Sequence, residues 1–320
     1  MSSHVSSVKT RVAVLMATYN GVFYVSSQIA SILWQLDVQV DLYIRDDGST
    51  DETLSMLHES FPQRRLFVIK EPNSPTSFLE RGAALNFFRL IASDQIVASN
   101  YDWIALSDQD DIWFPSKLSS AINDCFRTGS VAWSSSILAF WEKSGKALYI
   151  PKHGKVSKIN SLLESPGPGC TFLFRSEVFQ SLQSFVRHHL NTLKKVEFHD
   201  WFIYAFVMHK YGSWFISRLP SMLYRQHGLN VAGAGMSISQ VQKKLSLVYS
   251  GWYREQVLLI SSLLSTDKHP IVLRLKRFSL WDRLCLPLVL WPYRRKFQDK
   301  LVIALILPFS GVRKVIKRQY

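Results

Sequence analysis

The 320-residue sequence predicts an α/β protein with a mostly parallel sheet covered by helices, followed by a helical and basic C-terminal region. Three observations support this prediction. Short apolar runs alternate with helical patterns over the first 110 residues, which is typical of successive strand–helix–strand units. From Ser237 onward only helical patterns remain. Positive charge is concentrated near the C-terminus, since residues 268–320 hold 13 basic and 2 acidic residues, against 25 and 22 in residues 1–267.

Four apolar runs in the first third predict buried strands, because each is rich in Val, Leu or Ile and ends in a polar or glycine-containing turn. The runs cover 11–18, 40–45, 65–70 and 102–107. Apolar residues at helical spacing predict helices over 22–36, 51–59 and 81–97. One of Ser49, Thr50 or Asp51 is expected to cap the second of these helices. This alternation predicts a parallel sheet with both faces covered.

The order of elements becomes mixed beyond Pro115. The predicted elements are a helix ending near Phe126, a strand near 131–141, a loop over 165–170, a strand over 171–175, helices over 176–190 and 199–210, and two short strands over 214–226. The loop SPGPGC is rich in Gly and Pro, which favour turns. Because the pattern changes again at the C-terminal helices, we expect two parts, residues 1–235 and residues 236–320.

Composition excludes several classes of protein. With 47% hydrophobic and 19% charged residues, the chain is not disordered. Cys125, Cys170 and Cys285 are odd in number and far apart, which excludes a disulfide framework and favours a reducing compartment. The N-terminus lacks the apolar stretch of a secretory signal. The longest apolar runs, 284–292 and 301–309, are about half of the roughly 20 residues that a membrane-spanning helix needs, so none is predicted.

Carboxylates gather where predicted strands end. Asp46 and Asp47 follow the second strand, and Asp108, Asp110 and Asp111 follow the fourth. Ligands of open α/β sheets bind outside the carboxyl ends of the strands. Carboxylates brought together there repel one another unless a cation lies between them, and Mg²⁺ or Mn²⁺ commonly bridges such groups to phosphate oxygens. The pattern favours a site for a metal and a nucleoside diphosphate, while the alternative for DDGSTD alone is a turn and helix cap that binds no ligand.

Six motifs occur together in one order: ATYNG (17–21), DDGSTD (46–51), RGAALNF (81–87), SDQDDIWFP (107–115), HDW (199–201) and YRQHGLNVAGA (224–234). Jointly they resemble the family 2 inverting glycosyltransferases with the glycosyltransferase-A fold, and in particular the bacterial rhamnosyltransferases. The resemblance covers roughly residues 11–235. It implies a catalytic domain over 1–235 and leaves residues 236–320 without a counterpart.

The resemblance implies a donor-binding role for five residues of the first three motifs. Ala17 and Tyr19 match positions that frame the base and ribose of the donor nucleotide. Asp47 matches the acid that accepts a hydrogen bond from the pyrimidine N–H. Arg81 and Asn86 match a basic residue and an asparagine near the donor nucleotide.

Metal binding by Mg²⁺ or Mn²⁺ is implied for the acidic pair of the fourth motif. Asp110 matches the direct metal ligand, and Asp108 matches the acid nearer the ribose. Asp111 follows this pair and is a weaker candidate. His227 matches a position that meets the metal or the diphosphate, and its alternative is a histidine that only forms hydrogen bonds in a loop.

Asp200 matches the catalytic base, which takes the proton of the attacking hydroxyl so that a single displacement inverts the anomeric carbon. Its alternative is a cap at the start of the helix over 199–210. Trp201 is suited to stacking on a sugar. Gly169 and Cys170 are expected to lie under the acceptor, since glycine allows close backbone approach; the alternative is a tight connection without a ligand.

The basic C-terminal region interleaves Trp281, Trp291 and Tyr293 with short apolar runs and clusters of Lys and Arg. This composition favours amphipathic helices in a membrane interface, with the cations on anionic headgroups. The alternative is a set of helices that pack on the catalytic domain and leave their charge in water. We therefore expect a cytoplasmic protein, peripheral on the inner face of the plasma membrane.

The expected function is transfer of L-rhamnose from dTDP-L-rhamnose to a hydroxyl of a lipid-linked polysaccharide intermediate, as in O-antigen or capsule assembly. One alternative is transfer of galactose, glucose or N-acetylglucosamine from a UDP donor. Two others are a basic nucleic-acid-binding protein and an inactive scaffold. No nucleic-acid partner is expected, because the positive charge lies in the tail and no nucleic-acid motif is present. Intact Asp47, Asp108, Asp110 and Asp200 argue against the scaffold.

Overall fold

The computed structural model describes residues 9–59, 65–69, 81–227 and 238–310. Contacts between residues divide the chain into two compact units. The first contains the chain up to His153 together with Pro166–Ile203 and Ser213–His227, and the second contains Gly154–Ser165, Tyr204–Gly212 and the chain from Gly228 onward. The predicted boundary between residues 235 and 236 lies outside the described residues.

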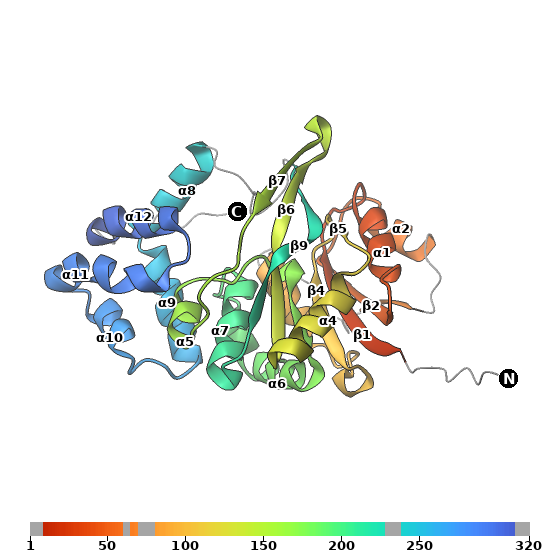
Figure 1. The fold of residues 1–320 in the computed structure, drawn as a ribbon, viewed down its shortest axis with the longest axis horizontal. Helices are drawn as coiled ribbons and strands as arrows, with labels where there is room; N and C mark the ends of the chain where they lie inside the picture. Colours follow the sequence, from red (N-terminus) through yellow and green to blue (C-terminus); the bar gives the residue numbers. More distant parts are fainter. Residues whose placement is uncertain (1–8, 60–64, 70–80, 228–237, 311–320) are drawn as a thin grey trace. The chain divides into compact units, whose positions relative to one another are not determined.

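The described residues of the first unit form a nine-stranded sheet (Figure 1). Its order is β3-β2-β1-β4-β8-β6-β9-β5, with β7 paired to β6 outside this path. The strands are β1 (Thr10–Thr18), β2 (Val38–Asp46), β3 (Leu66–Val68), β4 (Trp103–Ser107), β5 (Ile112–Trp113), β6 (Ala132–Trp141), β7 (Lys146–Ile150), β8 (Leu173–Arg175) and β9 (Phe215–Arg225). The β3-β2-β1-β4 part is parallel, as predicted, and β6 and β9 also pair in parallel. The remaining pairs are antiparallel.

Helices of the first unit follow the predicted strand–helix alternation. They are α1 (Val25–Leu33), α2 (Thr53–Glu59), α3 (Ala83–Ala92), α4 (Lys117–Thr128), α6 (Ser176–Leu193) and the start of α7 (His199–Tyr211). Helix α1 buries Val25, Ile29 and Ile32, the apolar residues that its sequence spacing places on one face. Strand β1 is apolar and buried along most of its length, as expected for a strand covered on both faces.

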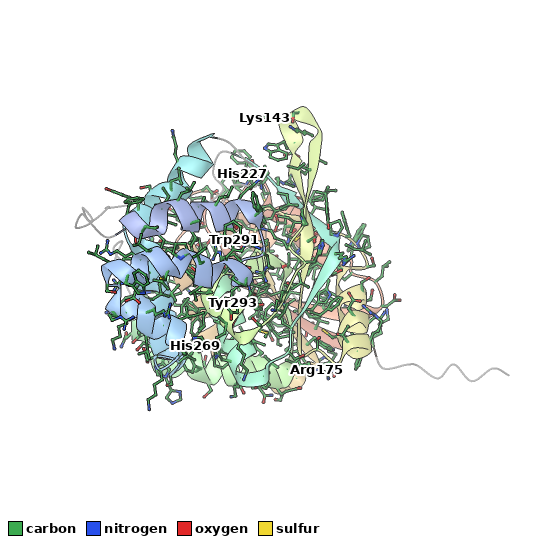
Figure 2. The ribbon with its side chains drawn as sticks, turned by 60° about the vertical axis from the view of Figure 1, so that its left-hand side comes forward. Lys143, Arg175, His227, His269, Trp291 and Tyr293 are labelled. Carbon is green, nitrogen blue, oxygen red and sulfur yellow. The ribbon has the colours of Figure 1, made fainter. Side chains whose placement is uncertain are left out.

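Three features of the sheet differ from the sequence prediction. The expected two short strands over 214–226 form one strand, β9. Its pairing with β6 shifts twice: two extra residues bulge out between Ser217 and Pro220, and one more lies between Pro220 and Leu223, after which pairing with β6 continues. Strand β7 and the two-residue β5 were not predicted. Figure 2 shows Lys143 at the tip of the hairpin that β6 and β7 form.

The described residues of the second unit form helices and loops and no strand, which confirms the helical pattern predicted for the C-terminal region over residues 238–310. The helices are α5 (Lys158–Leu163), the rest of α7, α8 (Ile238–Tyr249), α9 (Trp252–Leu263), α10 (Pro270–Arg277), α11 (Leu280–Leu290) and α12 (Phe297–Ile306). Helix α11 begins with a capping box in which Ser279 and Asp282 bond each other's backbone N–H. Within the described residues, no helix has the length and apolar character to cross a membrane.

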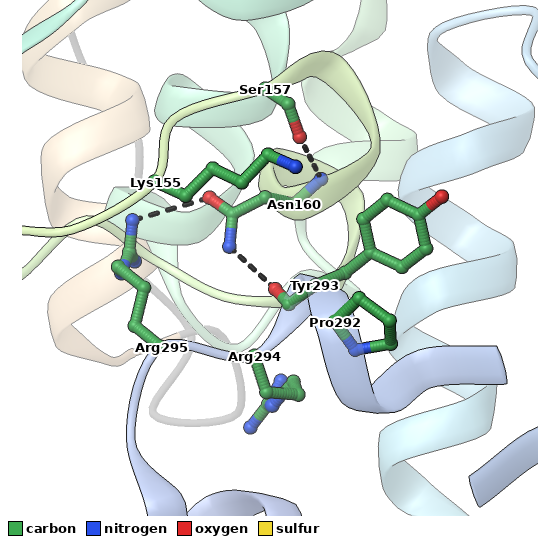
Figure 3. A pocket seen from close by; sticks show the side chains of 7 residues that line it. All are labelled: Lys155, Ser157, Asn160, Pro292, Tyr293, Arg294 and Arg295. Atoms are coloured by element: carbon green, nitrogen blue, oxygen red, sulfur yellow. Dashed lines mark hydrogen bonds between the residues drawn. The ribbon is translucent and has the colours of Figure 1, made fainter. Parts of the chain in front are cut away.

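A buried polar cluster ties the α5 segment to the chain between α11 and α12 (Figure 3). The Asn160 side chain donates to the Tyr293 carbonyl oxygen at 2.7 Å and accepts from Arg295 at 3.2 Å. Glu164 forms ion pairs with Arg294 and Arg295, at 3.5 and 2.9 Å. These two arginines are therefore engaged inside the second unit.

Candidate active site

The register of three parallel strands brings the polar motifs to one edge of the sheet. Thr18 at the end of β1 pairs with Asp46 at the end of β2, and Met16 of β1 pairs with Ser107 at the end of β4. The loops that follow these strands carry the first, second and fourth motifs. The strand order thus gathers residues that are about 90 positions apart in the chain, as expected for a ligand site in an open α/β sheet.

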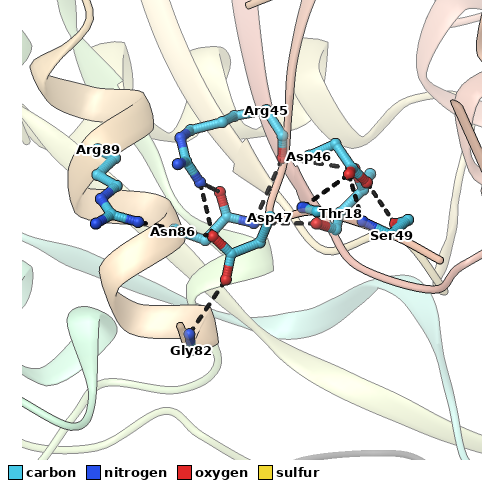
Figure 4. Close-up of polar contacts among 9 residues, drawn as sticks. Thr18, Arg45, Asp46, Asp47, Ser49, Gly82, Asn86 and Arg89 are labelled. Atoms are coloured by element: carbon cyan, nitrogen blue, oxygen red, sulfur yellow. Dashed lines mark hydrogen bonds and ion pairs between the residues drawn. The ribbon is translucent and has the colours of Figure 1, made fainter. Parts of the chain in front are cut away.

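Asp47 is a buried carboxylate held from two sides (Figure 4). Its Oδ1 accepts from Arg45 at 3.0 Å, and its Oδ2 accepts from the backbone N–H of Gly82 at 3.2 Å. The Arg89 guanidinium lies 3.9 Å from Oδ1. Asn86 is 2% exposed and links the same elements, because it accepts from Arg45 at 2.7 Å and donates to the Thr18 carbonyl at 3.1 Å. Nucleotide contacts by Asp47 and Asn86 stay predictions.

The other acids of the DDGSTD motif stabilise the loop itself. Asp46 accepts from the backbone N–H groups of Gly48 and Ser49, at 2.9 and 2.7 Å. Asp51 accepts from the backbone N–H of Thr53 at the start of α2. Burial raises the pKa of the Asp51 carboxyl, but its hydrogen bonds with Thr53 and Val22 outweigh burial, so the pKa is lowered. The turn-and-cap interpretation therefore holds for Asp46 and Asp51, while Asp47 points into the polar network.

The loop after β1 is fastened to the loop after β4 by one glutamine. The Gln109 side chain accepts from the backbone N–H of Tyr19 and donates to its carbonyl, both at 2.9 Å. A Cβ at Gly21 would lie 2.3 Å from Gln109 Oε1, so a larger residue there would displace the glutamine side chain from this position. The Tyr19 ring is 46% exposed, and the Arg81 guanidinium lies 6.0 Å from its centroid. Tyr19 and Arg81 thus lie close together, and Ala17 lies in β1 two residues before Tyr19. Contacts of all three with a nucleotide stay predictions.

Asp108, Asp110, Asp111 and Asp200 form an acidic cluster. Burial and the negative charges of Asp110 and Asp200 raise the pKa of Asp108 to about 7. Burial and the charges of Asp110 and Asp108 also raise the pKa of Asp111 well above its usual range. Its Oδ1 accepts from the Arg225 backbone N–H at 3.3 Å, and its Oδ2 has no hydrogen-bond partner within the described residues. Asp200 and the acids at the strand ends therefore interact electrostatically, although Asp108 and Asp200 are 92 positions apart in the sequence.

Lys117 places a buried positive charge beside this cluster. Its Nζ donates to the Cys170 carbonyl at 2.6 Å and lies 3.4 Å from the centroid of the Trp113 ring. Burial lowers the pKa of Lys117 to about 7, while Asp111 and Asp108 oppose this shift. The ammonium group partly balances the carboxylates and fixes the loop that contains Cys170.

His227 lies directly against Asp110. The imidazole Nε2 is 2.8 Å from Asp110 Oδ2, and the ring stacks on Tyr24 with centroids 4.4 Å apart. This distance is that of a hydrogen bond or ion pair. Carboxylate oxygens and an imidazole nitrogen are ligand types that Mg²⁺ or Mn²⁺ accepts, and metal binding by Asp108, Asp110 and His227 stays a prediction.

Cys170 lies near the same acids, since ligand atoms of Asp108, Asp111 and Cys170 lie within 4.8 Å of one another. Burial and the charges of Asp111 and Asp108 raise the pKa of the Cys170 thiol well above its usual value. The sulfur therefore stays protonated, and a thiol is a poor ligand for Mg²⁺ or Mn²⁺.

The residues predicted to bind the acceptor are largely covered. Cys170 is fully buried and Trp201 is 5% exposed. Gly169 lies against His199 so closely that a Cβ would approach the imidazole Nε2 to 2.4 Å. Asp200, in contrast, lies in the first turn of α7 and is partly exposed. Neither Cys170 nor Trp201 offers a free side-chain surface in this conformation, and acceptor binding by Gly169, Cys170 and Trp201 stays a prediction.

Sequence reasoning did not assign roles to Gln109, Lys117, Tyr24 or Arg225. The Arg225 Nε donates to the Asp110 carbonyl at 2.9 Å, and its guanidinium lies 5.0 Å from the centroid of the Tyr24 ring. Gln109 lies between the acids of the DQDD motif, and Arg225 lies two residues before His227 in the YRQHG motif. Their position in these motifs was the available signal.

Comparison with known proteins agrees with this geometry. The sequence profile of glycosyl transferase family 2 matches residues 13–183. The dTDP-rhamnosyl transferase RfbG of Shigella flexneri is 36% identical over 295 residues, which are 91% of this chain and 98% of that protein. An uncharacterized glycosyltransferase of Nostoc is 30% identical over 124 residues, 38% of this chain and 34% of that protein.

Solved structures show the same fold at low sequence identity. S. aureus TarS in complex with UDP-GlcNAc has a TM-score of 0.51 and 13% identity, covering 89% of this chain and 80% of that chain. The mannosyltransferase PcManGT of Pyrobaculum calidifontis, in complex with GDP-Man and Mn²⁺, has a TM-score of 0.51 and 16% identity. The match covers 96% of this chain and 89% of that chain. The fold is the glycosyltransferase-A fold, and the chain belongs to glycosyl transferase family 2.

Proposed function

We propose that this glycosyltransferase moves L-rhamnose from dTDP-L-rhamnose to a hydroxyl of a lipid-linked polysaccharide intermediate, with inversion at the anomeric carbon. The donor is supported by the relative from Shigella flexneri, a dTDP-rhamnosyl transferase that this chain matches over nearly its whole length. The observation that carries the reaction type is the acidic cluster, in which Asp200 of α7 acts electrostatically on the strand-end acid Asp108.

In this mechanism Asp108, Asp110 and His227 would hold Mg²⁺ or Mn²⁺, and the direct contact of His227 with Asp110 supports placing both residues at one site. A divalent cation there would supply Lewis-acid stabilisation of the negative charge on the leaving diphosphate. Asp200 accepts the proton of the attacking hydroxyl. Its place in the first turn of α7 supports this role, because the positive end of the helix dipole stabilises the carboxylate form that a base needs.

The donor nucleotide is assigned to the region of Tyr19, Asp47 and Arg81. Tyr19 offers a half-exposed ring for stacking, and Arg81 adds positive charge beside it. Asp47 is oriented by Arg45 and Gly82, so its direction is fixed before a ligand arrives. The acceptor is assigned to the loop of Gly169 and Cys170 and to Trp201, which must move to expose a binding surface.

We place the enzyme in the cytoplasm, peripheral on the inner face of the plasma membrane, where a lipid-linked acceptor and nucleotide sugars meet. The absence of a membrane-spanning helix in the described residues is compatible with this assignment. The basic residues of the C-terminal region support it, because anionic headgroups attract them.

The test is a thermal-shift panel of dTDP, dTDP-rhamnose, UDP and UDP-sugars, each with and without Mn²⁺. A ligand that binds only the native state raises the melting temperature by mass action. We expect the largest shift with dTDP-rhamnose plus Mn²⁺, and transfer of labelled rhamnose with inverted configuration. A larger shift with a UDP-sugar would overturn the donor assignment, and no shift with any nucleotide would support the inactive scaffold instead.

A further inference from the structure

We propose that the second unit binds an anionic lipid bilayer through one apolar face, formed by α11, α12 and the turn between them. This deepens the proposed function and rests on it for its purpose, since it names the surface through which the enzyme would reach a lipid-linked acceptor. The face is argued from residues 270–310, all of which the structure describes.

Helix α11 is apolar on both sides. Leu280, Leu284 and Leu288 are 81%, 63% and 76% exposed. Residues four apart advance about 40° around a helix, so these three side chains form one stripe along its exposed side. On the opposite side Leu286 and Leu290 are fully buried. Only the inner side is thus explained by packing of the second unit.

Helix α12 repeats this arrangement. Phe297, Leu301 and Leu305 follow the same spacing and are 64%, 39% and 64% exposed. The Trp291 ring, at the end of α11, meets the Phe297 ring edge-on with centroids 5.9 Å apart. Helices α11 and α12 also pack together. The two stripes are therefore joined into one apolar surface at this ring contact.

Positive charge borders this surface. Arg274, Lys276 and Arg277 are exposed at the end of α10, directly before α11. The Lys300 ammonium lies 5.5 Å from the centroid of the Trp291 ring. Asp282, one of the two acids after residue 267, is buried and paired with Arg277. An apolar face with cations at its rim has the composition of an interfacial helix pair.

A bilayer matches this surface better than a second copy of the chain. A twofold dimer would bring two identical basic rims together, whereas anionic headgroups neutralise them and the acyl boundary covers the leucines. Helices α11 and α12 have 11 and 10 residues, about half of a membrane span. They would lie in the plane of the interface, with the stripe toward the acyl chains.

The experiment is co-sedimentation of the full chain with vesicles of phosphatidylcholine alone or mixed with phosphatidylglycerol. The variant Leu280→Ser/Leu284→Ser/Leu288→Ser changes only exposed side chains, so we expect it to fold. Its partition onto anionic vesicles should fall at least about tenfold, because three leucines no longer leave water. The control Phe126→Ser/Leu219→Ser alters two residues of the first unit that are 64% and 75% exposed, and should bind like the wild type.

Charge is tested separately by Arg274→Gln/Lys276→Gln. Each lost cation should weaken binding to anionic vesicles about fivefold at low salt, and binding to phosphatidylcholine alone should not change. Wild-type vesicle binding by the triple serine variant would overturn the proposal. The proposal would also be overturned if the wild type formed a dimer that does not bind vesicles and the triple serine variant were a monomer.

The same samples separate this inference from the proposed function. Loss of vesicle binding with an intact dTDP-dependent thermal shift is the expected behaviour of the triple serine variant. A wild-type chain that shows the nucleotide shift but does not bind vesicles contradicts the lipid face alone. A wild-type chain that binds vesicles but no nucleotide contradicts the proposed reaction and leaves the lipid face standing.

Discussion

The candidate active site of the first unit and the α11–α12 face of the second unit depart from ordinary burial in opposite directions. In the first, charged groups lie inside: Asp47, Asp111 and Lys117 are 4%, 0% and 3% exposed. In the second, large apolar groups lie outside, as on α11, where Leu280 is 81% exposed. Buried charge is costly unless it is compensated, and contiguous exposed apolar surface is rare in monomers. Buried charged groups suit a site that binds a small ligand and reacts with it, and an exposed apolar face suits binding to an extended surface.

The largest test of this comparison is Asp200→Asn. An asparagine cannot take the proton of the attacking hydroxyl, so we expect kcat to fall about 10³-fold. The nucleotide-dependent thermal shift should stay, because Asp200 is not assigned to the donor. Single-turnover transfer of labelled rhamnose measures the chemical step.

The matched control lies in the second unit. Asp282→Asn removes an acid that is 1% exposed and whose partners among the described residues are Arg277 and Ser279 of the same unit. We expect a lower melting temperature and an unchanged kcat. An equal loss of kcat in the two variants would break the assignment of chemistry to the first unit.

Metal dependence is the next largest effect. Asp110→Asn should weaken the Mn²⁺-dependent nucleotide shift and reduce transfer about 100-fold, because a charged ligand becomes neutral. EDTA should abolish activity of the wild type, and added Mn²⁺ should restore it. Asp46→Asn is the control, since Asp46 accepts hydrogen bonds from its own turn. Equal Mn²⁺ dependence of the Asp110 variant and the wild type would remove Asp110 from the metal site.

The sequence was informative where a signal is local. Apolar runs that end in acidic turns predicted the parallel strands and placed Asp47 and Asp108 at one sheet edge, because strand periodicity and turn residues act within a few positions. The same holds for the helical C-terminal region. The resemblance predicted Asp200 as the catalytic base, whereas its local sequence alone would have indicated a helix cap.

Contacts between distant residues were beyond local signals. Lys117 bonds a carbonyl 53 positions away, and Gln109 bonds Tyr19 from 90 positions away. Residues 215–225 form a single strand because β9 pairs with β6 on both sides of Pro220. From the sequence alone, a proline at this position predicts the end of a strand. The leucine stripe of α11 is exposed because the opposite side of the helix packs in the second unit. A helix with apolar residues on both sides does not show in its sequence which side will be buried.

His199 offers a test of burial in the first unit through pH. Burial lowers its pKa to about 3, and its Nε2 has no hydrogen-bond partner within the described residues. The unfolded value is about 6.5, so the unfolded chain takes up the proton first and stability falls as the pH drops below 6.5, until the folded pKa is reached. From pH 7 to pH 5 this amounts to about 2 kcal/mol.

The measurement compares urea denaturation of the wild type and His199→Gln at pH 7 and pH 5. The variant should lose about 2 kcal/mol less stability than the wild type over this interval, since glutamine does not titrate. Parallel curves for the two proteins would mean that the imidazole is accessible to a proton in the folded state. That result would weaken the view that the first unit encloses its polar groups.

The smallest effect is expected for Gln109→Ala, which probes how firmly the donor loop is held. The two hydrogen bonds to Tyr19 contribute about 1 kcal/mol each, so their loss should raise KM for the nucleotide sugar by up to about thirtyfold and leave kcat nearly unchanged. Gln298→Ala, on the exposed side of α12, should change neither constant. A fall in kcat without a change in KM would show that Gln109 affects the acidic cluster beside it. In that case the position of the donor loop would be set by Gly21 and the end of β1, and not by Gln109.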